Sequence, residues 1–229
     1  MKKKLEDTLT KKVPIKVIPM GVDSKLFNLH SKHKQNMNIK TKFNITKPLL
    51  LFVGTLTEKK GAEYLIQALP KIISAFPRTK LLIVGSGTLG KSLKTLTKEL
   101  FLSNNVIFVG GIPNHQLAQY YASADILVIP SVKTKLGDVE GAPVVLMEGL
   151  AAGKAIVASH VGGIPEIITH NMNGLLVPEK DSRSLAQSII AILSNSTLQS
   201  KLERGAKIIS KNYDLKIVAE KFNKLYTQI

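Results

Sequence analysis

The feature that most constrains the fold of this chain is a series of short, unbroken apolar runs between residues 49 and 177. Four of these runs end at a Gly or a Pro, and they cover residues 49–53, 81–84, 106–109 and 126–129. Two further runs cover residues 155–158 and 174–177. Continuous rather than alternating apolarity is typical of strands that are buried on both faces of a parallel sheet. We therefore expect six parallel strands.

Helical patterns separate these runs. They cover residues 62–75, 90–102, 114–122, 143–152, 165–169 and 182–193, and residues 197–228 predict one or two more helices. Alternation of strand and helix produces right-handed βαβ units, which close into a doubly wound sheet. The sequence therefore predicts an α/β, Rossmann-like domain over residues 48–195, followed by a C-terminal helical tail over residues 196–229.

The first 47 residues read differently from the rest. Residues 13–19 (VPIKVIP) predict a short strand, residues 20–23 a turn, and residues 24–47 an exposed, Lys- and Asn-rich connection. This N-terminal part is too short to be a second Rossmann-like domain.

Charge and composition limit the classes of partner and cofactor. The chain has no Cys, which excludes disulfides and thiolate metal sites. The net charge of +16 is concentrated at the two ends, since residues 1–47 hold 12 Lys and three acidic residues. Basic ends favour an anionic lipid surface or a partner protein, although a merely solvated Lys-rich face remains an alternative. Nucleic acid is not expected, because aromatic residues do not interleave with the lysines. We expect a cytoplasmic protein, and peripheral contact with a membrane through the basic ends stays open.

Residues 138–148 (DVEGAPVVLME) carry two carboxylates eight positions apart, Glu140 and Glu148. Pro143 suits the first position of a helix, where its missing N–H has no partner in any case. This reading puts Glu140 in the loop at the helix mouth and Glu148 inside the helix among apolar neighbours. Because a buried unpaired charge is costly, Glu148 requires a polar partner, for which we expect a ligand.

Small residues follow the predicted strands. Doubly wound sheets bind ligands beyond the carboxyl ends of their strands, and Gly lets the backbone approach a ligand closely. Tight turns also favour Gly, so both readings stay open for any single position. The residues concerned are Gly54, Thr55, Gly85, Gly87, Gly110, Gly111, Pro130, Ser131, Gly162 and Gly163.

Three of these turns invite an anion. Residues 85–90 form a literal G-x-G-x-x-G, but no acidic residue follows the next strand to bind a ribose, which disfavours an NAD site. Lys60, before Gly61, can extend toward a phosphate, or it can be a solvated lysine. Gly162-Gly163 before Pro165 offers free N–H groups at a helix start. We expect the helix starts at Gly61, Pro143 and Pro165 to converge on one anionic ligand.

The order of these motifs resembles a known family. The segments GTLTEKKG, LLIVGSG, VIFVGGIPNHQLAQYYASADILVIPS, EGAPVVLMEGLAAGKAIVAS, VGGIPEII and NGLLVPEKD resemble the C-terminal, donor-binding domain of retaining GT-B glycosyltransferases. The family is the glycosyl transferases group 1, or family 4, and the likeness runs over residues 17–193. The E-x7-E element followed by VGGIPE is the specific part of it.

The resemblance implies roles for matching residues. Glu140 would contact hydroxyls of the donor sugar, Glu148 the ribose hydroxyls, and Lys60 the diphosphate. The catalytic residues implied are Glu140 and Lys60. The resemblance also places the nucleotide base near Gly110, Gly111 and Ile112. It places the phosphates and the sugar near Gly141, Ala142, Pro143, Val144, Gly162 and Gly163. Gly21 matches a glycine in the segment that opens this domain.

Two departures from the family pattern bear on activity. An Arg that stabilises the leaving diphosphate is replaced by Thr55, and removing one such donor typically costs about 10²–10³ in rate. The acceptor-binding domain of a GT-B enzyme is also missing from these residues.

The sequence therefore predicts a retaining, metal-independent glycosyltransferase domain without a cofactor, whose substrate is a nucleotide-diphosphate sugar and which needs a separate acceptor domain. A non-catalytic or split-gene nucleotide-sugar-binding subunit is one alternative. An NAD-dependent oxidoreductase is another, from a different class.

Overall fold

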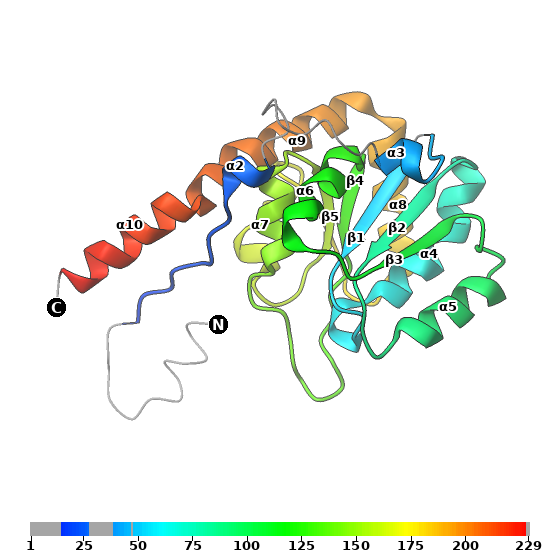
Figure 1. Ribbon diagram of the computed structural model, residues 1–229, viewed down its shortest axis with the longest axis horizontal. Helices are drawn as coiled ribbons and strands as arrows, with labels where there is room; N and C mark the ends of the chain where they lie inside the picture. Colours follow the sequence, from blue (N-terminus) through cyan, green and yellow to red (C-terminus); the bar gives the residue numbers. More distant parts are fainter. Residues whose placement is uncertain (1–14, 28–38, 47, 228–229) are drawn as a thin grey trace.

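The computed structural model describes residues 15–27, 39–46 and 48–227. Six parallel strands form one sheet in the order β3-β2-β1-β4-β5-β6 (Figure 1). The strands are β1 (Leu49–Val53), β2 (Lys80–Val84), β3 (Val106–Gly110), β4 (Ile126–Ile129), β5 (Ala155–Ser159) and β6 (Leu175–Val177). The predicted α/β, doubly wound parallel sheet is confirmed, and each apolar run forms a strand.

Both faces of the sheet are covered, as the unbroken runs require. Along β1, Leu49 and Leu51 belong to one core cluster, whereas Leu50 and Phe52 belong to the other. Alternate residues of a strand point to opposite faces, so each cluster fills one side of the sheet. Helices α4 (Ala62–Ala75), α5 (Gly90–Glu99) and α8 (Ser182–Ser194) cover one face, and α6 (Asn114–Ser123) and α7 (Val144–Ala151) cover the other.

Three helices differ from the sequence prediction. Helix α5 ends at Glu99, three residues early, because Phe101 adopts a left-handed conformation (φ 58°) that stops it. Pro143 is the N-cap of α7 rather than its first residue, with extended backbone. The helix predicted over residues 165–169 is only a single 3-10 turn, η2 (Ile164–Glu166). A turn this short has no helix macrodipole to attract an anion.

The strand and the exposed connection predicted near the N-terminus are wrong where the structure describes them. Residues 15–20 have no regular structure, while residues 13–14 lie outside the described part. Helices α2 (Ser24–Phe27) and α3 (Ile39–Lys42) follow, and Phe27 and Ile39 are buried in the core. The few apolar residues here are too widely spaced to give a periodic pattern, so only the fold reveals that they are buried. Residues 28–38 and 47 are not described.

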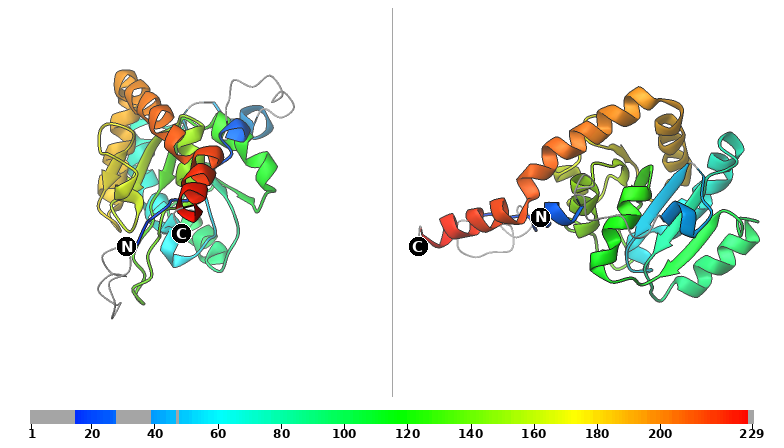
Figure 2. Two further views of the ribbon diagram at one scale, coloured as in Figure 1. Left: turned by 90° about the vertical axis from the view of Figure 1, so that its left-hand side faces the viewer. Right: turned by 45° about the horizontal axis from the view of Figure 1, so that its top comes forward.

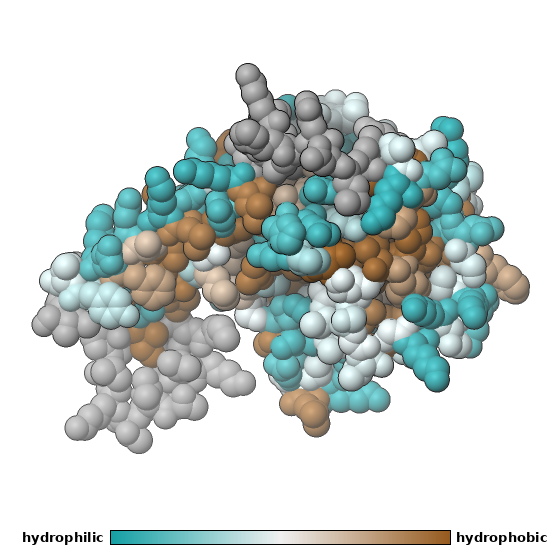
Figure 3. Space-filling model, viewed as in Figure 1, coloured by the Kyte–Doolittle hydropathy of each residue, from teal (hydrophilic) through white to brown (hydrophobic). Residues whose placement is uncertain are grey.

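The C-terminal residues form two α-helices, α9 (Ser196–Ser210) and α10 (Leu215–Tyr226), joined by η3 (Lys211–Tyr213). Helix α9 packs against α7 and β5, whereas α10 projects away from the sheet and begins beside the N-terminal segment, residues 15–22 (Figures 1 and 2). Val22 joins the two ends, since its N–H donates to Tyr213 O at 2.8 Å and its carbonyl accepts from Leu215 N–H at 3.1 Å. Apolar side chains of α10 stay exposed (Figure 3), among them Leu215, Phe222 and Tyr226. Within the described ranges, no helix combines the length and apolarity needed to cross a bilayer.

Candidate functional site

The order of the strands reverses between β1 and β4, and the loops after these two strands meet. In doubly wound sheets such a reversal opens a crevice at the carboxyl ends, where ligands bind. The loop after β1 ends in the 3-10 turn η1 (Glu58–Lys60), and Gly61 follows it. A Cβ on Gly61 would lie 1.9 Å from the carbonyl oxygen of Pro130, the residue after β4. The two loops are therefore packed in direct contact.

This contact brings Lys60 and Glu140 together. Lys60 Nζ donates to Glu140 Oε2 at 2.9 Å, and the lysine stem runs over Gly54. Lys59 Nζ lies 3.9 Å from Glu140 Oε1 and 3.0 Å from Asp138 Oδ2. The hydrogen bond to Asp138 raises the pKa of Lys59. Glu140 is buried, so a nearly enclosed carboxylate stands between two ammonium groups at the switch point of the sheet.

The turn after β5 fixes the backbone of Glu140. Gly162 adopts a left-handed conformation (φ 61°), and a Cβ there would lie 1.9 Å from Glu140 O. Gly163 N–H donates to the carbonyl oxygens of Glu140 and Gly141, at 3.2 and 2.9 Å. We expected free N–H groups in this turn. For Gly163 that expectation is wrong, because its N–H positions the Glu140 loop instead.

Helix α7 starts beside this turn. Its N-cap, Pro143, makes no side-chain capping bond, and Val144 is exposed at the first helical position. The uncapped end of a helix carries partial positive charge that favours an anion. Ala142 and Gly141 are partly exposed next to it. Of the three predicted helix starts, those at Gly61 and Pro143 thus flank the Lys60–Glu140 pair, whereas Pro165 belongs to the short turn η2.

Glu148 lies one turn deeper in α7 and is buried. Its polar partner in this structure is a protein group, since the Tyr121 hydroxyl donates to Glu148 Oε2 at 2.7 Å. Burial raises the pKa of Glu148, and the bond from Tyr121 opposes that rise. Tyr121 was missed by sequence reasoning. The only available signal was a tyrosine on the buried side of the helix that precedes β4.

The remaining small residues lie along the strand ends. Gly85 and Gly87 pack closely against the backbone of Gly54 and Leu56. Gly110, by contrast, has open space where a side chain would extend, and the nearest atom to a Cβ on Gly111 is Ser86 Oγ at 3.7 Å. Beside them, Ile112 is half-buried and packs on the core, while Thr55 at the end of β1 is exposed.

Ser131, two residues after β4, carries the one fully enclosed side-chain N or O atom in the described residues that lacks a hydrogen-bond partner. Metal-binding clusters of three or more His, Cys, Asp or Glu are absent from the same part of the chain.

Gly21 lies elsewhere. A Cβ on Gly21 would meet Leu215 Cδ2 at 2.9 Å and Val218 Cβ at 3.3 Å, so this glycine belongs to the crossing of the N-terminal segment with α10. We find it packed there and not against Lys60, Glu140 or Glu148.

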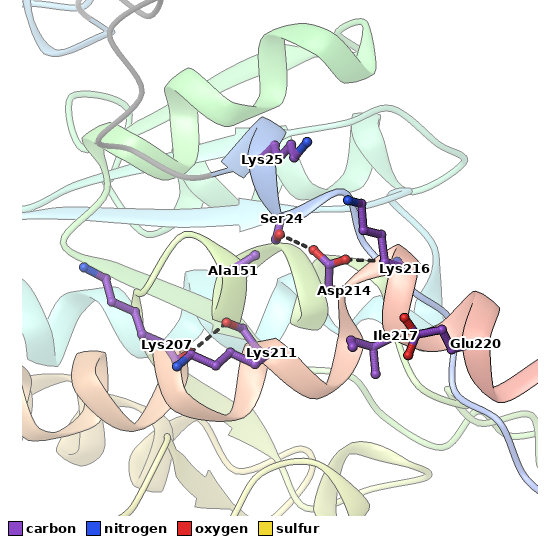
Figure 4. Close-up of a pocket in the computed structure, with 10 residues that line it drawn as sticks. Ser24, Lys25, Ala151, Lys207, Lys211, Asp214, Lys216, Ile217 and Glu220 are labelled. Carbon is purple, nitrogen blue, oxygen red and sulfur yellow. Dashed lines mark hydrogen bonds between the residues drawn. The ribbon is translucent and has the colours of Figure 1, made fainter.

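The same crossing borders a cleft of about 590 Å³ between α2, the end of α7, α9 and α10. Its basic side chains come from both ends of the chain, and its Asp214 accepts from the Ser24 hydroxyl (Figure 4). The lysines that line it are Lys25, Lys207, Lys211 and Lys216.

Comparison with known proteins identifies the family of this chain. The profile of the family described as glycosyl transferases group 1 matches residues 33–208. An uncharacterized glycosyltransferase of Methanocaldococcus jannaschii is 35% identical over 195 residues, which is 84% of this chain and 48% of the relative. A GDP-mannose-dependent monoacylated alpha-(1-6)-phosphatidylinositol monomannoside mannosyltransferase of Corynebacterium glutamicum is 35% identical over 181 residues, covering 78% of this chain and 46% of the relative. The chain thus spans about half the length of these relatives.

A solved structure shares the fold. The Anabaena protein HepE, crystallised in complex with UDP, superposes with a TM-score of 0.81 at 23% identity over 93% of this chain and 57% of its own. At this identity the likeness concerns the fold.

Proposed function

The chain belongs to the glycosyl transferases group 1 family, and we propose that it is the donor-binding domain of a retaining glycosyltransferase. In this proposal a hexosyl group passes from a nucleotide-diphosphate sugar to a hydroxyl acceptor. The observation that carries the proposal is the Lys60–Glu140 contact of 2.9 Å at the switch point between β1 and β4. It places a cation and a buried carboxylate where such a sheet binds its ligand.

Lys60 and the start of α7 receive the diphosphate. A leaving diphosphate gains negative charge in the transition state, and preorganised positive groups aimed at that charge lower the barrier. Glu140 directs its carboxylate to hydroxyls of the sugar. The Glu140 carboxylate accepts a hydrogen bond from Lys60 through Oε2. It can therefore hold the lysine and also accept hydrogen bonds from the sugar hydroxyls. The turn at Gly162 and Gly163 sets the position of the Glu140 backbone.

The nucleoside lies on the other side of α7. Glu148 accepts from the ribose hydroxyls, and the open space at Gly110 and Gly111 receives the base. Gly85 and Gly87 let the loop after β2 pack closely on the backbone of Gly54 and Leu56. This close packing leaves the ends of the strands accessible to the nucleotide. The base stays open between uracil, guanine and adenine.

Lys59 replaces the Arg whose position Thr55 occupies. Its ammonium group lies 3.9 Å from Glu140 Oε1, close enough to reach the same diphosphate. With two lysines and a helix start as positive groups, the proposed reaction needs neither a metal nor a cofactor. Transfer that persists in excess EDTA is the expected result, and loss of transfer that Mg²⁺ restores would contradict it.

The acceptor binds to a separate domain, on this or another polypeptide. The relatives, which are about twice as long as the matched region, support this proposal. The alternative is a subunit that binds nucleotide sugars without chemistry of its own, which the exposed Thr55 favours. Slow hydrolysis of a bound nucleotide sugar by the chain would support a catalytic donor-binding domain. Tight binding without any hydrolysis, even with an acceptor domain added, would support the non-catalytic subunit.

A donor panel tests the proposal. UDP-, GDP- and ADP-sugars are titrated in a calorimeter against the wild type, Glu148→Gln and, as a control, Glu220→Gln on the exposed helix α10. At least one donor should bind, and Glu148→Gln should weaken it more than tenfold while the control does not. Binding of NADH in place of every nucleotide sugar would refute the proposal and favour the oxidoreductase alternative.

We further propose peripheral contact with anionic lipid. Lys25, Lys207, Lys211 and Lys216 line one cleft, and exposed apolar side chains of α10 lie beside it. Basic and apolar groups on one surface attract negatively charged membranes. The chain should co-sediment with phosphatidylglycerol vesicles at low salt and not with phosphatidylcholine vesicles. Equal sedimentation with both would contradict an electrostatic contact.

A further inference from the structure

Glu148 receives its hydrogen bond from a residue that the proposed donor site does not include. We propose that Tyr121 is a positioning residue, which fixes one oxygen of Glu148 so that the other faces the ribose, and that Phe27 keeps the tyrosine ring in place. This inference rests on the proposed binding of a nucleotide sugar, and it adds residues from α6 and α2 to that site.

The geometry of Tyr121 leaves its hydroxyl little freedom. The side chain is fully buried, and the hydroxyl lies 2.7 Å from Glu148 Oε2 but 3.5 Å from the alternative acceptor, Val145 O. The ring of Phe27 meets the Tyr121 ring edge-on, with 5.4 Å between centroids and an interplanar angle of 86°. This is a favourable aromatic arrangement. The hydroxyl is therefore aimed at one carboxylate oxygen.

The second oxygen of Glu148 is available to a ligand. In the described structure Oε1 accepts no hydrogen bond. Among the described residues, the one side-chain atom that is both fully enclosed and without a hydrogen-bond partner is Ser131 Oγ, so Oε1 is not fully enclosed. Oε1 therefore keeps contact with solvent. A carboxylate has about four acceptor sites on its two oxygens, so one bond from Tyr121 leaves enough of them for the two hydroxyls of a ribose.

Charge favours the same arrangement. Burial and the nearby Glu148 raise the pKa of Tyr121 well above its usual value, so the hydroxyl remains a donor. Burial also raises the pKa of Glu148, and the bond from Tyr121 lowers it. Among the described residues, Tyr121 is the one titratable group that acts on Glu148 in this way. Removing the hydroxyl should leave the carboxyl group more easily protonated, and a protonated carboxyl accepts less well.

The connection to α2 explains why an N-terminal segment is buried against this site. Phe27 closes α2 and packs with that helix against α6 and α7, which carry Tyr121 and Glu148. A segment that the sequence presents as an exposed connection thus supports a residue of the donor site from behind.

The first test needs no ligand. The carboxyl ¹³C signal of Glu148, assigned with Glu148→Gln, is titrated in the wild type, in Tyr121→Phe and in Tyr120→Phe. Tyr121→Phe keeps the ring against Phe27 and removes only the hydroxyl. Tyr120→Phe makes the same change one residue away, on a hydroxyl that does not bond to Glu148. The titration midpoint of Glu148 should rise in Tyr121→Phe and stay at the wild-type value in Tyr120→Phe. An unchanged midpoint in Tyr121→Phe would overturn the inference.

The second test asks whether the effect passes through the ribose. UDP, GDP and ADP and their 2′,3′-dideoxy forms are titrated against the three proteins at several pH values. Tyr121→Phe should weaken the ribonucleotide roughly tenfold near neutral pH, with partial recovery at higher pH, and should leave the dideoxy form nearly unaffected. Equal weakening of both forms would indicate a merely structural role for Tyr121 and overturn the inference. If the wild type binds none of the nucleotides, the proposed function fails, and the carboxyl titration by itself then decides whether Tyr121 governs Glu148.

Discussion

Replacing Lys60 by Met separates the role of the Lys60–Glu140 contact in stability from its role in binding. Methionine keeps most of the lysine stem over Gly54 and removes only the charge. The variant should be less stable than the wild type and should bind a nucleotide-diphosphate sugar more weakly, because Glu140 then stays buried without its closest cation and the diphosphate loses a partner.

The exposed fractions of the two side chains set the magnitude. Ion pairs on the surface contribute about 0–1 kcal/mol, while breaking a fully buried pair costs about 3–5 kcal/mol. The Lys60 and Glu140 side chains are 19% and 8% exposed, which lies nearer the buried case. Lys59, at 3.9 Å from the same carboxylate, retains part of the attraction. We therefore expect a cost of about 2 kcal/mol, or a fall in Tm of about 5 °C for a chain of this size.

Urea denaturation and calorimetric titration with the best-bound nucleotide sugar measure the two effects. Lys40→Met is the matched control, since Lys40 pairs with Asp125 at 3.4 Å with similar exposure, 22% and 12%, at the opposite ends of the strands. It should lower stability and leave the affinity unchanged. A cycle with Glu140→Gln should give a coupling of about 1–2 kcal/mol. A coupling near zero would refute the stabilising contact, and unchanged donor affinity in Lys60→Met would refute the diphosphate role.

Three further predictions test other parts of the structure. Gly162→Ala and Gly110→Ala both place a side chain at positive φ, which costs about 1–2 kcal/mol, but only the methyl group at position 162 collides with a carbonyl oxygen. Urea denaturation should therefore show a larger loss of stability for Gly162→Ala, and equal losses would contradict the contact between Gly162 and Glu140. Ser131→Ala removes an enclosed, unpartnered hydroxyl and should raise stability by about 1 kcal/mol in a thermal scan, whereas a loss would point to an unseen partner. Ser24→Ala removes the hydrogen bond that lowers the pKa of Asp214. The variant should therefore be less stable than the wild type at neutral pH, and this difference should disappear as the pH falls through the pKa of Asp214. A difference in stability that does not change with pH would contradict the stabilising hydrogen bond.

Local pattern explains why the strands and most helices could be predicted. A strand buried on both faces of a parallel sheet needs an apolar residue at every position. Residues 49–53 and 126–129 meet this requirement, because every residue in them is apolar. The errors in the N-terminal part fall where burial depends on a few isolated residues. Phe27 and Ile39 are core residues inside polar segments, and only their distant neighbours determine that.

The candidate site divides in the same way. The sequence by itself singled out Lys60, Glu140 and Glu148 as candidates, because Lys60 precedes a glycine, the two carboxylates lie on either side of Pro143, and the order of these motifs resembles the family. The strand order decided the rest. It brings Lys60 to Glu140 across 80 positions of the chain and Tyr121 to Glu148 across 27. A residue's type and its near neighbours determine local conformation and burial, whereas the partner of a buried charge depends on which strands lie side by side, and that is a property of the packed sheet alone.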